Sequence, residues 1–117
     1  MNFKEMSEAI HKNNVEKGFW PRLNVDEVMI KLALIHSEVS EAVEALRDAG
    51  SLEEAVKFKT QTTKDGHQKP ECMATELSDI CIRTFDLAYA LGLDLEELIE
   101  IKHQYNLTRP HKHGKSF

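Results

Sequence analysis

The chain has 117 residues, of which 41% are hydrophobic and 30% charged, with 15 basic and 20 acidic side chains and a formal net charge of -5. This length suits one domain, which we assign to residues 1–117. About a quarter of the residues are Leu, Ile, Val or Phe, more than the roughly 20% below which charged chains tend to stay disordered. The net negative charge argues against a general nucleic-acid-binding protein, which needs a basic face.

No apolar run in the sequence reaches the ~20 residues of a membrane-spanning helix, and the N-terminal segment has no signal-peptide core. We therefore expect a cytoplasmic protein without a membrane partner. The two cysteines, Cys72 and Cys81, would lie about 13 Å apart along one helix, which is too far for a disulfide. The metal-binding spacing CxxC is absent, so both cysteines are expected to be buried thiols.

Helix signals dominate the first half of the chain. Residues 2–18 carry a weak apolar stripe that ends before a Phe-Trp-Pro break. A capping box that begins at Asn24 predicts a helix of about 25 residues, which ends before Gly50. A second capping box predicts a short helix near residues 52–59. The polar segment 59–69 is expected to be a loop or mobile insert.

Two further helices are predicted in the second half. Pro70 can occupy the first turn of a helix that ends near Gly92. Asp94 is the predicted N-cap of a last helix that continues to about Asn106, and Pro110 ends this pattern. No strand alternation is visible. The expected fold is all-α, a bundle of four main helices with a short extra helix or loop insert.

The predicted helix 71–91 is apolar around well over half of its circumference. Three neighbouring helices in a small monomer would not easily cover such a surface. We therefore expect an oligomer, a homodimer or homotetramer, whose interface buries this helix. Its one polar strip holds the residues Cys72, Glu76, Asp79, Arg83 and Asp86.

Two helices each carry a pair of acidic residues one turn apart, Glu38 with Glu41 and Glu76 with Asp79. If the pairs face each other, two carboxylates about 6 Å apart repel by roughly 3 kcal/mol at an effective dielectric near 20. Such a cluster needs cations, and ligands that are all oxygen favour a hard ion, Mg²⁺ or Mn²⁺. The alternative is that these acids are solvated helix faces, since such spacings are common in an acidic chain.

The end of the chain is basic, with no acidic residue from position 102 onward. Lys102, Asn106 and Arg109 recur at i, i+4 and i+7, which on a continued helix is one face. A cationic face beside a metal cluster would suit a polyphosphate, because Lys and Arg neutralise phosphate oxygens. The alternative is an ordinary disordered basic terminus.

Two further residues are candidates for substrate binding. Lys31 lies two turns before Glu38 on the same helix face and could reach a phosphate, although it could equally be a surface lysine. Trp20 could stack on a nucleobase, but an aromatic residue at such a break also commonly packs as a hydrophobic staple.

Three segments together resemble the MazG-like nucleotide pyrophosphohydrolases, an all-α superfamily with an ExxE…ExxD signature. They are EKGFW at 16–20, LALIHSEVSEAVEALR at 32–47, and ELSDICIRTFDLAYALGLDLEELIEIKHQYNLTRPHKHGKSF at 76–117. The resemblance implies a dimer or dimer of dimers that cleaves a nucleoside triphosphate between the α and β phosphates. By matching position it also implies that the Mg²⁺ ligands are Glu38, Glu41, Glu76 and Asp79, and that the triphosphate contacts are Lys102, Asn106 and Arg109.

In the mechanism that follows, Glu41 or Glu38 takes the proton from the attacking water. One departure from the family pattern is the longer segment between Glu41 and Glu76, with an insert at about residues 51–69. The contribution of that segment to base selection is therefore undefined. Phosphoribosyl-ATP hydrolysis within the same superfamily remains an alternative.

Two other classes of protein compete with this interpretation. Glu8 with His11 and Glu100 with His103 form two ExxH pairs, which di-iron carboxylate bundles also use. A di-iron site would leave Glu41, Asp79 and the basic tail without a role. The other alternative is a non-catalytic helical module that binds a protein partner.

Overall fold

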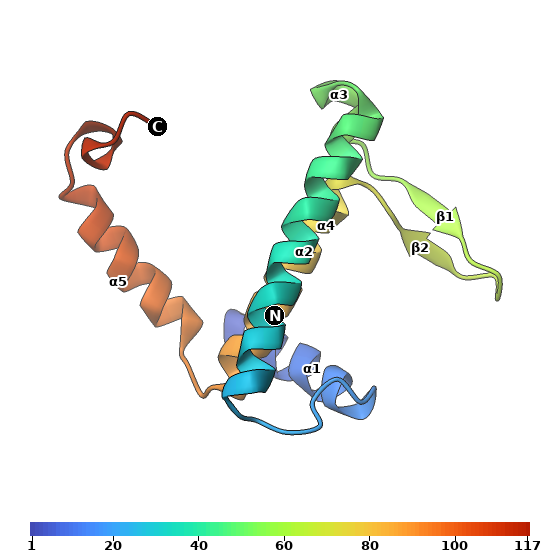
Figure 1. The fold of residues 1–117 in the computed structure, drawn as a ribbon, viewed down its shortest axis with the longest axis horizontal. Helices are drawn as coiled ribbons and strands as arrows, with labels where there is room; N and C mark the ends of the chain where they lie inside the picture. The colour runs from blue at the N-terminus through green and yellow to red at the C-terminus, as the bar shows by residue number, and fades with distance from the viewer.

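The computed structural model describes residues 1–117, and the helical character of the fold is confirmed. Four main helices are present, together with one short helix, a two-stranded hairpin and a final 3-10 turn (Figure 1). In chain order the elements are α1 (Phe3–Glu16), α2 (Val25–Ala49), α3 (Leu52–Ala55), β1 (Thr60–Thr62), β2 (Gln68–Pro70), α4 (Met73–Ala90), α5 (Leu95–Leu107) and η1 (His111–Gly114).

Local hydrogen bonds explain where the helices begin and end. The side chain of Asn24 accepts a hydrogen bond from the Glu27 backbone N–H at 2.9 Å, as expected of an N-cap. Asp94 makes the equivalent bond at the start of α5. Gly50 ends α2 with φ 77°, a left-handed conformation that glycine adopts without a Cβ clash. The predicted caps of these helices are confirmed.

The segment predicted as a loop, residues 59–69, forms an antiparallel hairpin in which Thr60 pairs with Pro70 and Thr62 with Gln68. The expectation that the chain has no strands was therefore wrong. Both strands are three residues long and exposed, so no apolar alternation marks them in the sequence. The prediction that Pro70 lies in the first turn of a helix is also wrong. Pro70 is the last residue of β2, and α4 begins later, with Cys72 as its N-cap.

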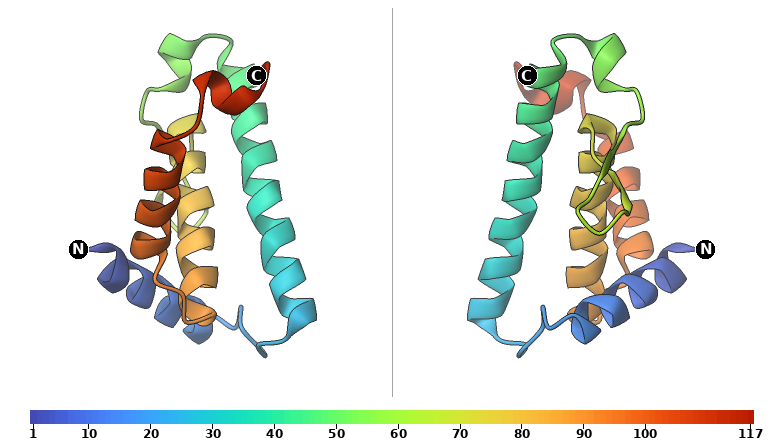
Figure 2. Two further views of the ribbon diagram at one scale, coloured as in Figure 1. Left: turned by 90° about the vertical axis from the view of Figure 1, so that its left-hand side faces the viewer. Right: turned by 90° about the vertical axis from the view of Figure 1, so that its right-hand side faces the viewer.

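Helix α4 is the centre of the fold. The antiparallel helix α2 packs along it, α1 packs against it from another side, and the hairpin projects from the end at which α4 begins (Figures 1 and 2). Helix α5 turns away after Gly92 and makes its main helix contact with α1. The four helices are thus present as predicted, but α5 does not close them into a compact bundle.

The single chain covers little of its apolar surface. Its radius of gyration is 16.9 Å, whereas a compact domain of this length has about 13 Å. The buried apolar residues are Ala55, Leu87 and Ala88. Cys81 is exposed and Cys72 half-buried, so the prediction of two buried thiols is wrong for the isolated chain. Exposed large apolar side chains on α2 and α5 include Met29, Leu32, Val39, Val43, Leu46, Leu98, Ile99, Ile101 and Leu107.

Every helix in the structure is too short or too polar to serve as a membrane span.

Replacing Asn24 by Ala should lower the free energy of unfolding by about 1 kcal/mol, because the first turn of α2 loses its side-chain acceptor. Chemical denaturation of both proteins measures this difference. Asn13→Ala, at an exposed position inside α1, is the matched control and should be neutral or slightly stabilising. Equal stability of Asn24→Ala and the unaltered chain would contradict the assigned role of this cap.

Candidate functional site

The packing of α2 against α4 brings together three of the four predicted acidic residues. Glu38 comes from the middle of α2, while Glu76 and Asp79 come from the first half of α4, one turn apart on one face. One carboxylate oxygen from each of the three lies within 4.8 Å of the others. Glu38 and Glu76 are buried, and Asp79 is half-buried. The acidic cluster, as we call these three residues, fits the predicted arrangement of facing pairs.

Glu41 lies at the exposed rim of the acidic cluster, one turn after Glu38. A hydrogen bond with Glu38, and the negative charge of that residue, raise the pKa of Glu41 above its ordinary value. Glu41 is therefore an accessible carboxyl group beside the cluster and not a fourth member of its closely spaced set.

Glu76 and Asp79 form no ion pair within the chain. Burial and the negative charges of Glu41 and Asp79 raise the pKa of Glu76 to about 7. Burial and the charge of Glu38 likewise raise the pKa of Asp79. The Oε2 atom of Glu76 is buried and has no hydrogen-bond partner. A hard divalent cation would be a suitable partner for this oxygen, because such ions bind several carboxylate oxygens at once.

Arg83 supplies part of the missing positive charge. Its Nε atom donates a hydrogen bond to Oε1 of Glu38 at 2.7 Å. Burial acts to raise the pKa of Glu38, but the hydrogen bonds with Glu41 and Arg83 outweigh it, so the net pKa of Glu38 lies below its ordinary value. Arg83 was not predicted as a site residue. Its place on the polar strip of α4, four residues after Asp79, was the available signal.

A cavity of about 160 Å³ extends from the acidic cluster toward α1 and the α1–α2 connection. Two carboxylates of the cluster and two cationic side chains contribute to its wall. The lining residues are Asn14, Phe19, Lys31, Glu38, Asp79, Ile82, Arg83 and Asp86. This cavity therefore combines anionic groups that suit a metal ion with cationic groups that suit phosphate oxygens.

Lys31 lines this cavity, and Trp20, which does not line it, contacts the Lys31 side chain. Lys31 is only 9% exposed, so it is not a surface lysine. Its ammonium group donates to the backbone carbonyl of Phe19 and lies 4.6 Å from the centroid of the Trp20 ring. The indole N–H of Trp20 donates to Asp86. Trp20 is thus held by a polar contact. From the sequence, only base stacking and hydrophobic packing were expected of this residue.

The predicted basic face on α5 does not reach the acidic cluster of the same chain. Lys102 Nζ and Arg109 Cζ lie 5.4 and 5.6 Å from the centroid of the Tyr105 ring, and Asn106 Oδ1 is buried without a partner. None of these residues lines the cavity. Helix α5 ends at Leu107, close to the predicted end at about Asn106, so Arg109 lies beyond the helix and the three residues do not share one helix face.

The two ExxH pairs do not come together as a group of potential metal ligands. His11 contacts Asp86, while Glu100 and His103 lie on α5, which stands apart from α2 and α4 (Figure 1). The only close group of potential metal ligands is the acidic cluster. This arrangement does not support a di-iron centre.

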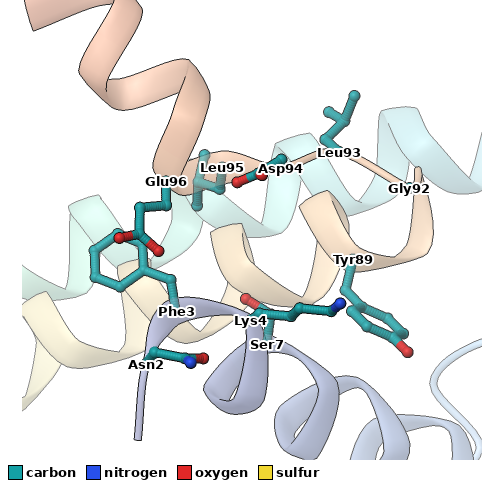
Figure 3. A pocket seen from close by; sticks show the side chains of 10 residues that line it. All are labelled: Asn2, Phe3, Lys4, Ser7, Tyr89, Gly92, Leu93, Asp94, Leu95 and Glu96. Carbon is teal, nitrogen blue, oxygen red and sulfur yellow. The ribbon is translucent and has the colours of Figure 1, made fainter.

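A larger cavity, of about 690 Å³, lies between the start of α1 and the turn that joins α4 to α5 (Figure 3). Phe3, Ser7 and Tyr89 form part of one side, and residues 92–96 form the other. No member of the acidic cluster lines it. The cavity is present because α5 diverges from α4 after Gly92 and does not pack along it.

No protein-family model, no curated protein and no solved structure matches this chain.

Replacing Glu76 by Gln should stabilise the metal-free chain by about 1–3 kcal/mol at pH 8. The pKa of Glu76 is raised in the folded state to about 7, so its ionisation weakens the fold as the pH rises through that value. The advantage of the variant should shrink as the pH falls from 7 toward 4.5. Denaturation in EDTA at several pH values measures it.

The matched control for this measurement is Glu8→Gln, which removes an acid from an exposed position on α1. It should show no comparable gain at pH 8. A Glu76→Gln variant that is equally or less stable than the unaltered chain at pH 8 would contradict the electrostatic account of the cluster.

Proposed function

We propose that this protein is a nucleoside triphosphate pyrophosphohydrolase that uses Mg²⁺, or Mn²⁺, and releases a nucleoside monophosphate and pyrophosphate. The observation that carries the proposal is the acidic cluster, whose buried Glu76 Oε2 atom has no partner. The cluster adjoins a cavity with two cationic side chains, Lys31 and Arg83. The sequence resemblance to MazG-like enzymes supports the same reaction.

The residues of the acidic cluster fit a hard divalent ion, since all of their donor atoms are carboxylate oxygens. Glu38, Glu76 and Asp79 would hold the ion, and Glu41 could join them from the rim. Such an ion, when bound, polarises a phosphoryl oxygen and makes a bound water more acidic.

The hydrolysis adds the oxygen of a water molecule to the α-phosphorus. The bond from that phosphorus to the oxygen bridging the α and β phosphates breaks, and pyrophosphate leaves with the electron pair. A carboxylate takes the proton of the water. Glu41 suits this role better than Glu38, because its pKa is raised toward neutrality while Glu38 is paired with Arg83.

Lys31 and Arg83 are the cations placed to neutralise substrate phosphates, since both line the cavity that holds Glu38 and Asp79. The nucleoside would extend along the cavity toward Phe19 and Trp20. The ring of Trp20 already carries the ammonium group of Lys31 near one face, so a nucleobase would stack there only on the remaining aromatic surface.

A second copy of the chain would complete the site. Lys102, Asn106 and Arg109 suit phosphate contacts, but α5 does not bring them to the cavity of its own chain. Large apolar side chains are exposed on both α2 and α5, which in water favours their burial against another surface. A homodimer or homotetramer in which α5 of one copy approaches α2 of another would cover these faces and supply the basic residues.

The exposed apolar faces of α2 and α5 also favour a second candidate, a helical module that binds a different protein. This candidate gives no role to the orphaned oxygen of Glu76. It predicts that neither Mg²⁺ nor nucleotides change the thermal stability of the protein.

The reaction is tested with the standard NTPs and dNTPs in the presence of Mg²⁺, with products separated by anion-exchange chromatography. Monophosphate and pyrophosphate should form and should disappear when EDTA is added. Formation of diphosphate and phosphate would contradict the assigned bond. Absence of turnover with every nucleotide would contradict the proposed enzyme and favour the interaction module.

Glu38→Gln and Asp79→Asn should each reduce kcat by about 100-fold or more, because each removes a charged ligand from the acidic cluster. Circular dichroism should show unchanged helicity. Glu44→Gln, at an exposed position on α2, is the matched control and should retain activity. A Glu38 or Asp79 variant with full activity would remove that residue from the metal site.

A mixture of two inactive variants tests whether the site is shared between copies. Glu38→Gln and Arg109→Ala, unfolded and refolded together, should regain about a quarter of the original activity, since half of random dimers carry one intact site. Glu38→Gln mixed with Asp79→Asn should regain none, because both changes affect the cluster of one chain. A monomer in gel filtration, or no recovery in the first mixture, would contradict the shared site.

A further inference from the structure

Asp86 is a buried carboxylate that the proposed reaction does not use. It lies on α4 two turns after Asp79, on the same polar strip, and is 5% exposed. Its side chain forms no hydrogen bond or ion pair with the acidic cluster, with a lysine or with an arginine. Burying a carboxylate is costly unless hydrogen bonds compensate for lost water, so the identity of its partners is informative.

Every hydrogen bond to the side chain of Asp86 comes from a residue that precedes α2 in the chain. Oδ1 accepts from Nδ1 of His11 at 2.7 Å, and Oδ2 accepts from Nδ2 of Asn14 at 3.0 Å. The indole N–H of Trp20 lies 3.0 Å from Oδ1 and 2.9 Å from Oδ2. One carboxylate thus fastens both α1 and the α1–α2 connection to α4.

These contacts lead directly to the cavity beside the acidic cluster. Asn14 and Phe19 belong to its wall together with Asp86 itself. The Lys31 ammonium group is held by the Phe19 carbonyl, by the Glu27 carboxylate at 3.7 Å and by the face of the Trp20 ring. Trp20 is thus one of the three groups that position the ammonium group, and the bond to Asp86 fixes the orientation of its ring.

A purely structural link between helices would not need this chemistry. Apolar side chains of similar size join helices without the cost of a buried charge, and replacing buried polar groups by such residues is often neutral or stabilising. A carboxylate that binds three directional donors instead fixes how each donor is oriented. The tryptophan ring and the lysine stacked on it are the groups so oriented.

We infer that Asp86 is a positioning residue that orients Trp20, and through it Lys31, to form the nucleotide-binding end of the cavity. The inference rests on the proposed nucleotide hydrolysis, since it assigns a role in binding that substrate. The side-chain hydrogen bonds of Asp86 go to His11, Asn14 and Trp20, none of which belongs to the acidic cluster. Asp86 acts on the affinity for the nucleotide and not on the chemical step.

The test compares Asp86→Asn with the unaltered chain, using the best nucleotide from the panel described above. KM should rise about tenfold, as expected when a hydrogen bond to a charged group is lost, while kcat stays within about threefold. Trp20 is the only tryptophan, so its fluorescence reports on the same contact. Its emission should shift in Asp86→Asn and not in Asp48→Asn, which removes the same charge from an exposed position.

A second variant, Trp20→Phe, keeps an aromatic ring but removes the indole donor. It should raise KM in the same direction, and combining it with Asp86→Asn should add little, because both changes break one contact. If Asp86→Asn does not fold, Trp20→Phe carries the test alone. An unchanged KM in the folded variant, a loss confined to kcat, or fully additive effects would overturn the role of Asp86.

Different results would contradict the role of Asp86 and the proposed hydrolase activity. An unaltered chain that hydrolyses nucleotides while Asp86→Asn and Trp20→Phe keep the original KM contradicts the positioning role only. An unaltered chain that hydrolyses no nucleotide contradicts both the enzyme and the role of Asp86 within it.

Discussion

The packing of α2 on α4 forces Glu38 against Glu76 and Asp79, and the rest of the proposed site depends on this burial of like charges. Carboxylates separated by less than 5 Å repel strongly where water is excluded. Arg83 offsets only part of this repulsion, through its hydrogen bond to Glu38, and the pKa of Glu76 is raised to about 7. Under the proposed function, a divalent cation bound by these carboxylates would offset this cost.

The polar strip of α4 organises the site along its length. Glu76 and Asp79 occupy its first turns, Arg83 follows one turn later, and Asp86 lies at the far end. The strip thus connects a place suited to a divalent cation with a cationic wall and with the fastening point of Trp20. This order suits a substrate that has a polyphosphate at one end and an aromatic base at the other.

The sequence predicted what depends on local spacing. Asn24 and Asp94 are N-caps in the structure because a capping interaction spans only three residues. Glu76 and Asp79 share a face because helical periodicity requires it. Their proximity to Glu38 was inferred from two acidic pairs that each lie beside an apolar stripe.

What the sequence did not reveal depends on contacts between distant segments. The bond of Arg83 to Glu38 spans 45 positions, and that of Trp20 to Asp86 spans 66, so no local pattern encodes them. The hairpin was missed because its exposed strands lack apolar alternation. The departure of α5 was missed because an amphipathic pattern shows that a face will be covered, but not by which surface.

The most direct test of the central claim is a calorimetric titration of Mg²⁺ and Mn²⁺ into the metal-free protein at pH 8. The account predicts saturable binding by the unaltered chain and its loss in Glu76→Gln, with Glu8→Gln as the control that keeps binding. Absence of binding by the unaltered chain, or equal binding by Glu76→Gln, would contradict the acidic cluster as a metal site.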